Sequence, residues 1–327
     1  MLSSAEGREL RDDSTYMKPL TANWIRRSAA LNVCAIGVAL FAADKIAEVS
    51  INQPKDLFPE SITSLKDGTI ILGSVPGGIY KIKPGETEAK PFIAREGNGF
   101  TTLLGVLADE KANTLWVCNT GPGVLKAFDL GTGKAKGSYP MPTGAVCNDI
   151  AVADNGTAYA SDTAGAKLFM LKKGAAALEQ AAADPLLAGV DGLAFGDKNT
   201  LYVNSVTANK LIKLDLGPDG KSTKVTDLKL SGPLGAPDGL RALGKHKFLQ
   251  AENGNAARAG GRLAMVTVDP KTNVATIRTL KEGMLATPAT TATKGMAWVV
   301  EGKQDYRNGK NKGQDPTPFK LYAVKIP

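Results

Sequence analysis

A segment of one pattern recurs about every 44 residues, or at twice that spacing, along this chain. Each copy has a polar or tight-turn head, a short apolar stretch, a turn rich in Asp, Asn, Gly or Lys, and an alternating strand closed by a polar residue. The copies span 59–74, 103–119, 147–162, 190–205 and 237–253, with a looser sixth copy at 287–302. A repeat of this length is typical of a circular array of small sheets, in which equivalent positions meet around one axis.

Further predicted strands follow each of the first five copies. They lie at 78–94, 124–139, 167–174, 210–228 and 262–280. About four strands per unit and six units predict an all-β fold, a six-bladed β-propeller with four-stranded antiparallel blades around a central channel. Helix is nearly absent from the pattern. The main exception is the Ala-rich stretch 175–189, which either forms a short helix or, more simply, lengthens the connection between two blades.

The first 43 residues have the pattern of a targeting segment. Arg26 and Arg27 precede an apolar run at 28–43 that Asn32 interrupts. The run is too short to cross a bilayer comfortably, but it suits the apolar core of a secretory signal. We therefore predict a signal or targeting segment at 1–43, used by the general secretory or the twin-arginine route, with an uncleaved membrane anchor as the alternative.

The remaining residues, 44–327, are predicted to form a single domain, because no linker, charge block or low-complexity tract divides them. Met17 is an alternative start, since the residues before it are hydrophilic and are not needed for an export signal. In each case the domain is expected outside the cytoplasm, periplasmic or secreted. Cys118 and Cys147 lie on neighbouring predicted blades, so they are either free or joined by a disulfide in an oxidising compartment.

The charge pattern argues against nucleic acid as a partner. The net charge is +8, and the basic residues are mostly scattered, whereas a nucleic-acid-binding protein usually has a dense basic stripe. One basic cluster, in the polar loop 302–318, is either a solvated surface or an attraction for an anionic ligand; it contains Lys303, Arg307, Lys310 and Lys312. We expect a small-molecule substrate, no nucleic acid, and no membrane contact by the mature domain.

Histidine chemistry is nearly excluded, because His246 is the only histidine in the chain. It lies in a hairpin-like stretch that we predict to be away from the channel mouth. No GxSxG elbow accompanies it, so a Ser–His–acid triad is not favoured. Haem, copper and His-rich zinc sites are not favoured either. Any chemistry is therefore expected to use carboxylates, amides and a hard cation.

Four of the repeat heads carry oxygen ligands: Glu60, Asn148, Asp191 and Asp238. The first strand of each propeller blade lines the channel, and all six start at one rim, so these side chains are predicted to converge. Three acids in a narrow mouth repel one another and lose solvation unless a cation neutralises them. Carboxylates with an amide carbonyl suit Ca²⁺. The sequence therefore predicts one divalent ion, preferably Ca²⁺, held by these four residues.

A purely structural interpretation of the heads is also open. Asp-Gly and Asn-Asp pairs form turns readily, so Asp191 and Asp238 could serve only as Asx turns at the start of a blade. The register of all four heads with the repeat favours the metal site over this alternative. The polar residues that close the second strands are predicted to form an outer ring near the same mouth; they are Asn119, Asp162, Asn204, Glu252 and Glu301.

The motifs at these heads resemble those of the SMP-30/gluconolactonase/LRE-like family of six-bladed propellers. They are PES at Glu60, CNDIAV at Asn148, VDGLAFG with LYVNS at Asp191, and PDGLR at Asp238. The resemblance covers nearly all of residues 44–327. Asp191 stands where the family usually has Asn, which adds a negative charge. Val146 stands where sugar-lactone members often have an Arg that contacts the substrate, so the substrate is not expected to be an aldonolactone.

The resemblance implies metal-assisted opening of a lactone or related ester. By position, Glu60, Asn148 and Asp238 would be ligands of one divalent ion, commonly Ca²⁺, that polarises the carbonyl. Asp191 is expected to be the fourth ligand. Asp238 would also be the catalytic base that directs a water molecule at the carbonyl carbon. Asn148 and Asn119 are expected to contact and orient the substrate.

Two functions of other classes stay open at this point. The first is a non-catalytic extracytoplasmic propeller that binds a ligand and holds a structural ion, which Asp191 and Val146 favour. The second is a relative of strictosidine synthase, a propeller that condenses an amine with an aldehyde by means of a Glu base. Hydrolysis of lactones and aryl esters that is lost with a chelator would separate the hydrolase from both.

Overall fold

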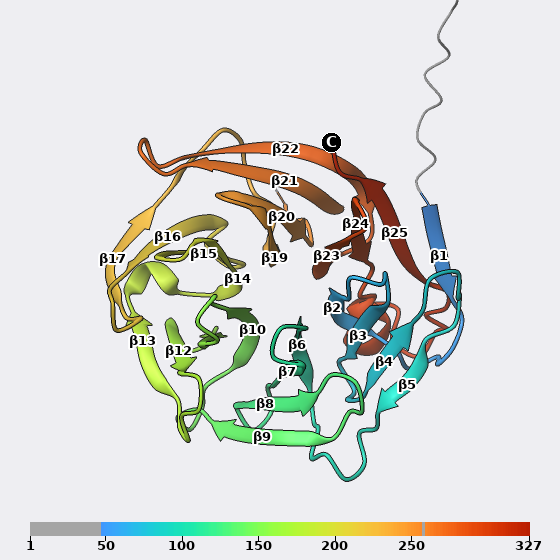
Figure 1. Cartoon of the computed structure of the whole chain (residues 1–327). Coiled ribbons are helices and arrows are strands. Elements are labelled where there is room, and N and C mark those ends of the chain that lie inside the picture. Colours follow the sequence, from blue (N-terminus) through green and yellow to red (C-terminus); the bar gives the residue numbers. More distant parts are fainter. Residues whose placement is uncertain (1–46, 257–258) are drawn as a thin grey trace, which may run out of the picture. The chain divides into compact units, whose positions relative to one another are not determined.

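The computed structural model describes residues 47–256 and 259–327, and these residues form six sheets around one axis (Figure 1). Each sheet contains an antiparallel meander of four strands, which confirms the predicted six-bladed β-propeller. The inner strand of every blade begins where a sequence repeat was expected. The predicted targeting segment, 1–43, lies outside the described residues.

The first three blades follow one another without interruption. Blade 1 consists of β2 (Pro59–Ser64), β3 (Ile70–Ser74), β4 (Ile79–Ile82) and β5 (Lys90–Ile93). Blade 2 consists of β6 (Leu103–Asp109), β7 (Thr114–Asn119), β8 (Val124–Asp129) and β9 (Ala135–Pro140). Blade 3 consists of β10 (Cys147–Val152), β11 (Ala158–Asp162), β12 (Lys167–Leu171) and β13 (Glu179–Ala183).

The last three blades carry the additions to the basic pattern. Blade 4 consists of β14 (Val190–Asp197), β15 (Thr200–Ser205), β16 (Lys210–Leu216) and β17 (Ser222–Asp227). Blade 5 consists of β19 (Pro237–Gly244), β20 (Lys247–Glu252), β21 (Gly261–Asp269), β22 (Val274–Met284) and the short parallel strand β18 (Lys229–Leu230). Blade 6 consists of β23 (Ala289–Thr293), β24 (Met296–Val300), β25 (Phe319–Lys325) and β1 (Ala47–Ile51).

Blade 6 closes the ring by joining the two ends of the domain. Its outermost strand, β1, comes from the start of the described chain and pairs antiparallel with β25, from Ala47 opposite Ala323 to Ile51 opposite Phe319. The sequence pattern did not predict this closure, because β1 precedes the first repeat. In the Ala-rich stretch the structure has β13, the outer strand of blade 3, and a 3-10 turn, η1 (Pro185–Leu187), in place of an α-helix or a plain connection.

Adjacent blades pack face to face through apolar side chains that alternate along each strand. On β15, Leu201 and Val203 pack against the blade 3 cluster that contains Tyr159. Tyr202, between them, points the other way and packs on Phe248 of blade 5, with ring centroids 4.9 Å apart. This period-two alternation is what a strand between two sheets requires. Each fully buried side chain of this size contributes roughly 1.5–3 kcal/mol relative to exposure.

Each of the five polar residues at the ends of the second strands accepts a hydrogen bond from a backbone N–H near the start of the inner strand of its own blade. Asn119 accepts a hydrogen bond from the backbone N–H of Thr101 at 3.0 Å, and Glu252 accepts one from Gly235 at 2.7 Å. We call this set the clasp residues: Asn119, Asp162, Asn204, Glu252 and Glu301. All five side chains are buried. These five side chains accept hydrogen bonds from backbone donors near the starts of the inner strands, which gives the expected outer ring a structural use.

A disulfide joins blades 2 and 3. Cys118 on β7 and Cys147 on β10 are bonded, with their Cα atoms 5.2 Å apart. Cys147 directly precedes Asn148, so the bond fixes the chain beside one of the predicted site residues. Among the described residues, no helix has both the length and the apolar character needed to span a membrane.

Candidate active site at the start of the inner strands

The inner strands β10, β14 and β19 each begin with the same irregularity. Strand pairing stops after Cys147, Val190 and Pro237 and resumes three residues later. The two residues skipped in each strand are Asn148 with Asp149, Asp191 with Gly192, and Asp238 with Gly239. A bulge of this kind frees a side chain from the strand alternation and re-aims it. The repeat therefore places a polar side chain at the start of each of these three strands.

Gly192 allows blades 4 and 5 to approach closely at this point. A Cβ atom on Gly192 would lie 2.2 Å from the backbone oxygen of Asp238, which is closer than any real contact. The Asn204 clasp spans the same junction, because its amide accepts from Gly192 N at 2.9 Å and donates to Asp238 O at 2.6 Å. The Asp191-Gly192 pair thus brings the Asp191 and Asp238 segments together across two blades, beyond any role as a turn.

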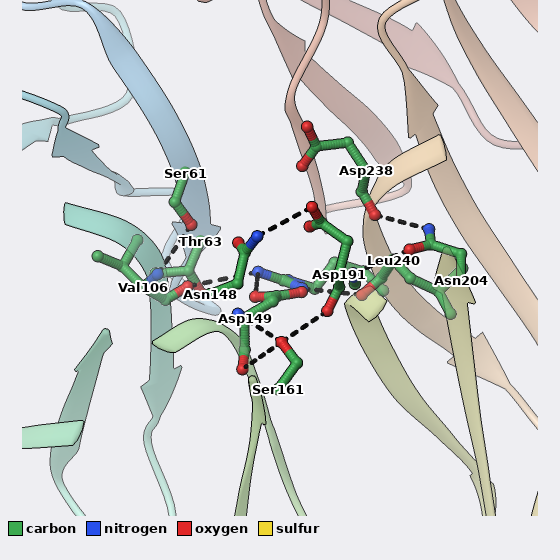
Figure 2. Close-up of polar contacts among 12 residues, drawn as sticks. Ser61, Thr63, Val106, Asn148, Asp149, Ser161, Asp191, Asn204, Asp238 and Leu240 are labelled. Carbon is green, nitrogen blue, oxygen red and sulfur yellow. Dashed lines mark hydrogen bonds and ion pairs between the residues drawn. The ribbon is translucent and has the colours of Figure 1, made fainter. Parts of the chain in front are cut away.

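We call Glu60, Asn148, Asp191 and Asp238 the head cluster. Asn148 Nδ2 donates to Asp191 Oδ2 at 2.9 Å (Figure 2). It also donates to Thr163 Oγ1 at 3.0 Å. Asp191 and Asp238 lie close enough to affect each other's pKa, and the charge of Glu60 acts on both. The structure therefore brings Asn148, Asp191 and Asp238 to one junction, with Glu60 near enough for its charge to act on the two aspartates. Their role as metal ligands stays a prediction.

Neighbouring amides hold two members of the head cluster. Asn253 Nδ2 donates to Asp238 Oδ2 at 2.7 Å, and Gln304 Nε2 donates to Glu60 Oε2 at 3.0 Å. Asp191 is 5% exposed, and its Oδ1 atom is buried without a hydrogen-bond partner. A buried carboxylate oxygen without a donor is costly unless a ligand or cation supplies the missing interaction.

Burial and mutual repulsion disfavour the charged forms of these acids. Desolvation, followed by the charge of Asp149, raises the pKa of Asp191 to about 8. Desolvation raises the pKa of Glu60 to about 7, against the opposing effects of Gln304 and Arg307. Desolvation and the charges of Asp191 and Glu60 raise the pKa of Asp238 well above its ordinary value. Strongly shifted carboxyl groups that lie near one another are a common mark of a functional site.

The donor set is compatible in kind with a hard cation. Three carboxylates, one amide and an unpartnered Asp191 oxygen match the oxygen ligands that Ca²⁺ prefers. Within residues 47–256 and 259–327, no three His, Cys, Asp or Glu side chains are grouped tightly enough to form a metal site by themselves. The amide of Asn148 would therefore have to take part, together with closer approach of the acids.

Asn119 is the one predicted site residue that the structure does not bring to the head cluster. It is fully buried, its Oδ1 accepts from Thr101, and its Nδ2 donates to Gly99 O at 2.8 Å. Because both polar ends of this side chain are used inside blade 2, its predicted contact with substrate has no part in the function proposed below.

Sequence reasoning missed Thr163, Asn253 and Gln304 around the head cluster, and it named Arg307 only as part of the basic cluster in the loop 302–318. Thr163 and Asn253 each directly follow a clasp residue, so their place in the repeat was a signal that could have revealed them. Gln304 and Arg307 lie on α1 (Gln304–Asn308), inside the loop that was expected to be irregular. No feature of the repeat points to α1, because it lies between β24 and β25 of the closing blade.

The other end of the channel holds the large cavity. Its volume is about 940 Å³, and the ends of all six inner strands line it, from Thr63 and Ser64 on β2 to Thr291 and Ala292 on β23. An ion pair across the axis lies on the head-cluster side of this cavity, where Arg241 Nη1 and Nη2 contact Asp149 Oδ2 and Oδ1 at 2.6 and 2.9 Å. Both residues are buried, so the pair obstructs the channel between the two ends.

The fold and the head cluster together define a six-bladed propeller with a carboxylate and amide site at one mouth of its channel. Three solved structures are similar to it. A gluconolactonase of Xanthomonas campestris matches with a TM-score of 0.59 and 15% identity over 82% of this chain and 86% of that one. Luciferin-regenerating enzyme matches with a TM-score of 0.59 and 10% identity over 86% of this chain and 95% of that one.

The third structure is virginiamycin B lyase of Staphylococcus aureus, with a TM-score of 0.58 and 11% identity over 86% of this chain and 99% of that one. No protein-family model and no curated protein sequence matches this chain. At these identities the likeness shows the fold. The neighbours include a gluconolactonase and luciferin-regenerating enzyme, in agreement with the resemblance that the sequence motifs indicated.

Proposed function

We propose that this protein is a metal-dependent hydrolase that opens a lactone or a related ester at the head cluster. The observation that carries the proposal is the junction of Asn148, Asp191 and Asp238, where three blades meet and one carboxylate oxygen lacks a partner. The enzymes among the structural neighbours support the proposal at the level of fold, as do the motifs around each head.

Glu60, Asn148, Asp191 and Asp238 would hold one divalent ion, with Ca²⁺ the preferred candidate. When bound, such an ion polarises the ester carbonyl and offsets the negative charge that develops on its oxygen. Asn148 is suited to fix the geometry, because its Nδ2 is committed to Asp191 and Thr163 and its Oδ1 has no hydrogen bond among the described residues. Asp191, with an added charge relative to the usual Asn, would strengthen the hold on a cation.

Asp238 is our candidate for the general base. In the metal-free protein, desolvation and the nearby acids raise its pKa, and a bound cation would oppose this effect and keep Asp238 as the carboxylate, the form that accepts a proton. Asn253 binds Oδ2 and thereby orients the carboxylate. The side chain is also partly exposed, which leaves it accessible to a water molecule at the mouth. It would take a proton from that water as the water attacks the carbonyl carbon, and it would return the proton to the leaving alkoxide oxygen when the ester C–O bond breaks.

The test is hydrolysis of γ- and δ-lactones and aryl esters by purified protein that has been treated with chelator and then reloaded with Ca²⁺. Turnover that disappears with chelator and returns with the ion supports the proposal. Absence of turnover on the whole panel after metal reloading would overturn it.

A binding protein with a structural ion is the second candidate function. The additional acid at Asp191 favours it, because a more negative cage holds a cation tightly but weakens that cation as a Lewis acid. In this case Ca²⁺ would raise the melting temperature without any turnover in the same assay.

We further propose that the propeller works outside the cytoplasm. The buried Cys118–Cys147 bond supports this location, because stable disulfides form in oxidising compartments. Cell fractionation of the full chain, with the disulfide assayed in each fraction, tests it. Reduced protein confined to the cytoplasm would contradict the proposal.

A further inference from the structure

The short helix α1 lies beside the head cluster. Gln304, its first residue, donates to Glu60 at 3.0 Å, and Figure 1 shows α1 as an orange coil next to β2. Arg307 follows Gln304 by three residues, so the two side chains project from the same face of the helix. The positive charge of Arg307 acts on Glu60 accordingly.

The segment that carries α1 is fixed by several contacts. Lys303 Nζ donates to the backbone oxygens of Pro316 and Pro318 at 2.8 and 2.6 Å. Asn311 Nδ2 donates to Asp305 Oδ2 at 2.6 Å, which ties the end of the helix to its first turn. Arg307 is therefore presented to the mouth from a braced turn of helix.

Arg307 differs from the other basic residues of this segment. It is half-buried, whereas Lys310 and Lys312 are exposed. Glu60, the acid it influences, is already bonded to Gln304, and no hydrogen bond or ion pair to another described residue occupies the Arg307 guanidinium. A guanidinium offers a planar set of donors that matches a carboxylate with two parallel hydrogen bonds. Among the described residues this guanidinium has no such partner, and its positive charge acts on Glu60 of the head cluster.

We propose that Arg307 binds a carboxylate of the substrate, so that the ester or lactone carries a negative charge of its own. The inference rests on the proposed function and narrows its substrate class. A carboxylate fits better than a phosphate, because a single guanidinium balances one negative charge and the acids of the head cluster would repel a dianion more strongly.

The experiment compares two aryl esters that differ only by a carboxylate on the acyl chain. The proteins are the wild type, Arg307→Gln, and Lys310→Gln as the matched control, which removes the same charge from an exposed position of the same segment. We expect Arg307→Gln to raise KM for the carboxylated ester by about tenfold or more, with the neutral ester unaffected. Arg307→Lys should recover only part of this loss, because an ammonium lacks the paired donors.

Equal effects of Arg307→Gln on both esters, or an equal effect of Lys310→Gln, would overturn the inference. Calorimetric titration of Ca²⁺-loaded protein with glutarate separates this failure from failure of the proposed hydrolase. If no ester is hydrolysed but glutarate binds and Arg307→Gln abolishes that binding, the carboxylate site stands and the hydrolase falls. If esters are hydrolysed and Arg307 affects neither KM nor glutarate binding, the hydrolase stands and this inference falls.

Discussion

Asp149 and Asp191 are both buried carboxylates at the start of inner strands, and their surroundings are opposite. Asp149 is 4% exposed, and both of its oxygens are bonded to the guanidinium of Arg241. Asp191 is 5% exposed, but only an amide donates to one of its oxygens and the other has no partner. Both oxygens of Asp149 therefore have hydrogen-bond partners, whereas one oxygen of Asp191 has none. We infer that Asp149 has a structural role and that Asp191 belongs to the site.

The same contrast separates the two ends of the channel. The head cluster is an acidic mouth without a fully matched cation, whereas the Asp149–Arg241 pair closes the way to a large cavity with lysines at its edge, including Lys66 and Lys111. Cavity size alone favours the end opposite to the proposed site. Unsatisfied acid and shifted pKa values favour the smaller mouth as the place for chemistry.

The largest effect is expected from Asp238→Asn. Loss of a general base should lower kcat by about 10²–10⁴-fold on any ester that the wild type hydrolyses. The matched control is Asp154→Asn, which makes the same change at the edge of the cavity at the other end. Steady-state kinetics on both variants test the comparison directly. Equal loss in the two variants, or full activity of Asp238→Asn, would contradict the assignment of the mouth.

The next effect is on stability, from Asp149→Ala or Arg241→Met. Removing one partner leaves a buried charge without its counterpart, which typically costs about 3–5 kcal/mol in the free energy of unfolding. Denaturant titration should show this loss for each single variant. The Lys210–Asp227 pair is the control: both side chains are more than a third exposed, so Asp227→Ala should cost about 1 kcal/mol or less. Similar losses at both pairs would show that Asp149 is not the special structural acid that we infer.

A smaller loss is expected when the disulfide is removed. The double variant Cys118→Ala with Cys147→Ala should lose about 2–4 kcal/mol of unfolding free energy, because the bond restricts the unfolded chain over a separation of 29 residues. A reductant should lower the unfolding free energy of the wild type and leave that of the double variant unchanged. Since Cys147 precedes Asn148, we expect Ca²⁺ affinity to fall as well. Unchanged metal affinity would show that the bulge alone positions Asn148.

The blades could be predicted from the sequence because each repeat contains its own turn signals and alternating strands. Pro59, Cys147, Val190 and Pro237 begin inner strands where the repeat copies begin. Closure by β1 was not predictable from that pattern, since a single outer strand without a repeat partner has no periodic signature. β13 was missed because its sequence, Glu-Gln-Ala-Ala-Ala, favours helix, and pairing with β12 overrides that preference.

For the polar residues, the repeat predicts where a side chain lies but not which groups it contacts. Convergence of the head cluster followed from symmetry, because equivalent positions of a propeller must meet. The use of each polar group depends on its neighbours. Asn119 was expected to contact substrate but binds backbone, while Arg307 lay in a loop with no repeat signal and yet faces Glu60. Composition does not distinguish these cases, because the deciding partners come from other blades.

The smallest effect is expected in the stability of the metal-free protein as pH changes. The folded-state pKa of Asp191 is raised from 3.8 to about 8, and that of Glu60 from 4.5 to about 7. The folded state therefore keeps protons that the unfolded state releases, and stability falls as pH rises from about 4 to about 8. Because Glu60 reaches solvent at the mouth and Asp191 does not, we expect most of the decrease in melting temperature to come from Asp191.

Asp191→Asn sharpens this last comparison, because it restores a neutral amide beside Asn148 and Asp238. The variant should show a flatter dependence of melting temperature on pH in chelator, together with weaker binding of Ca²⁺. Added Ca²⁺ should raise the melting temperature of the wild type most at pH 8, where the carboxyl groups of the head cluster are most ionised. The melting temperatures of the wild type and Asp191→Asn could instead fall in parallel between pH 4 and pH 8. In that case ionisation of Asp191 does not cause the loss of stability, and the contrast with Asp149 no longer supports a functional role for Asp191.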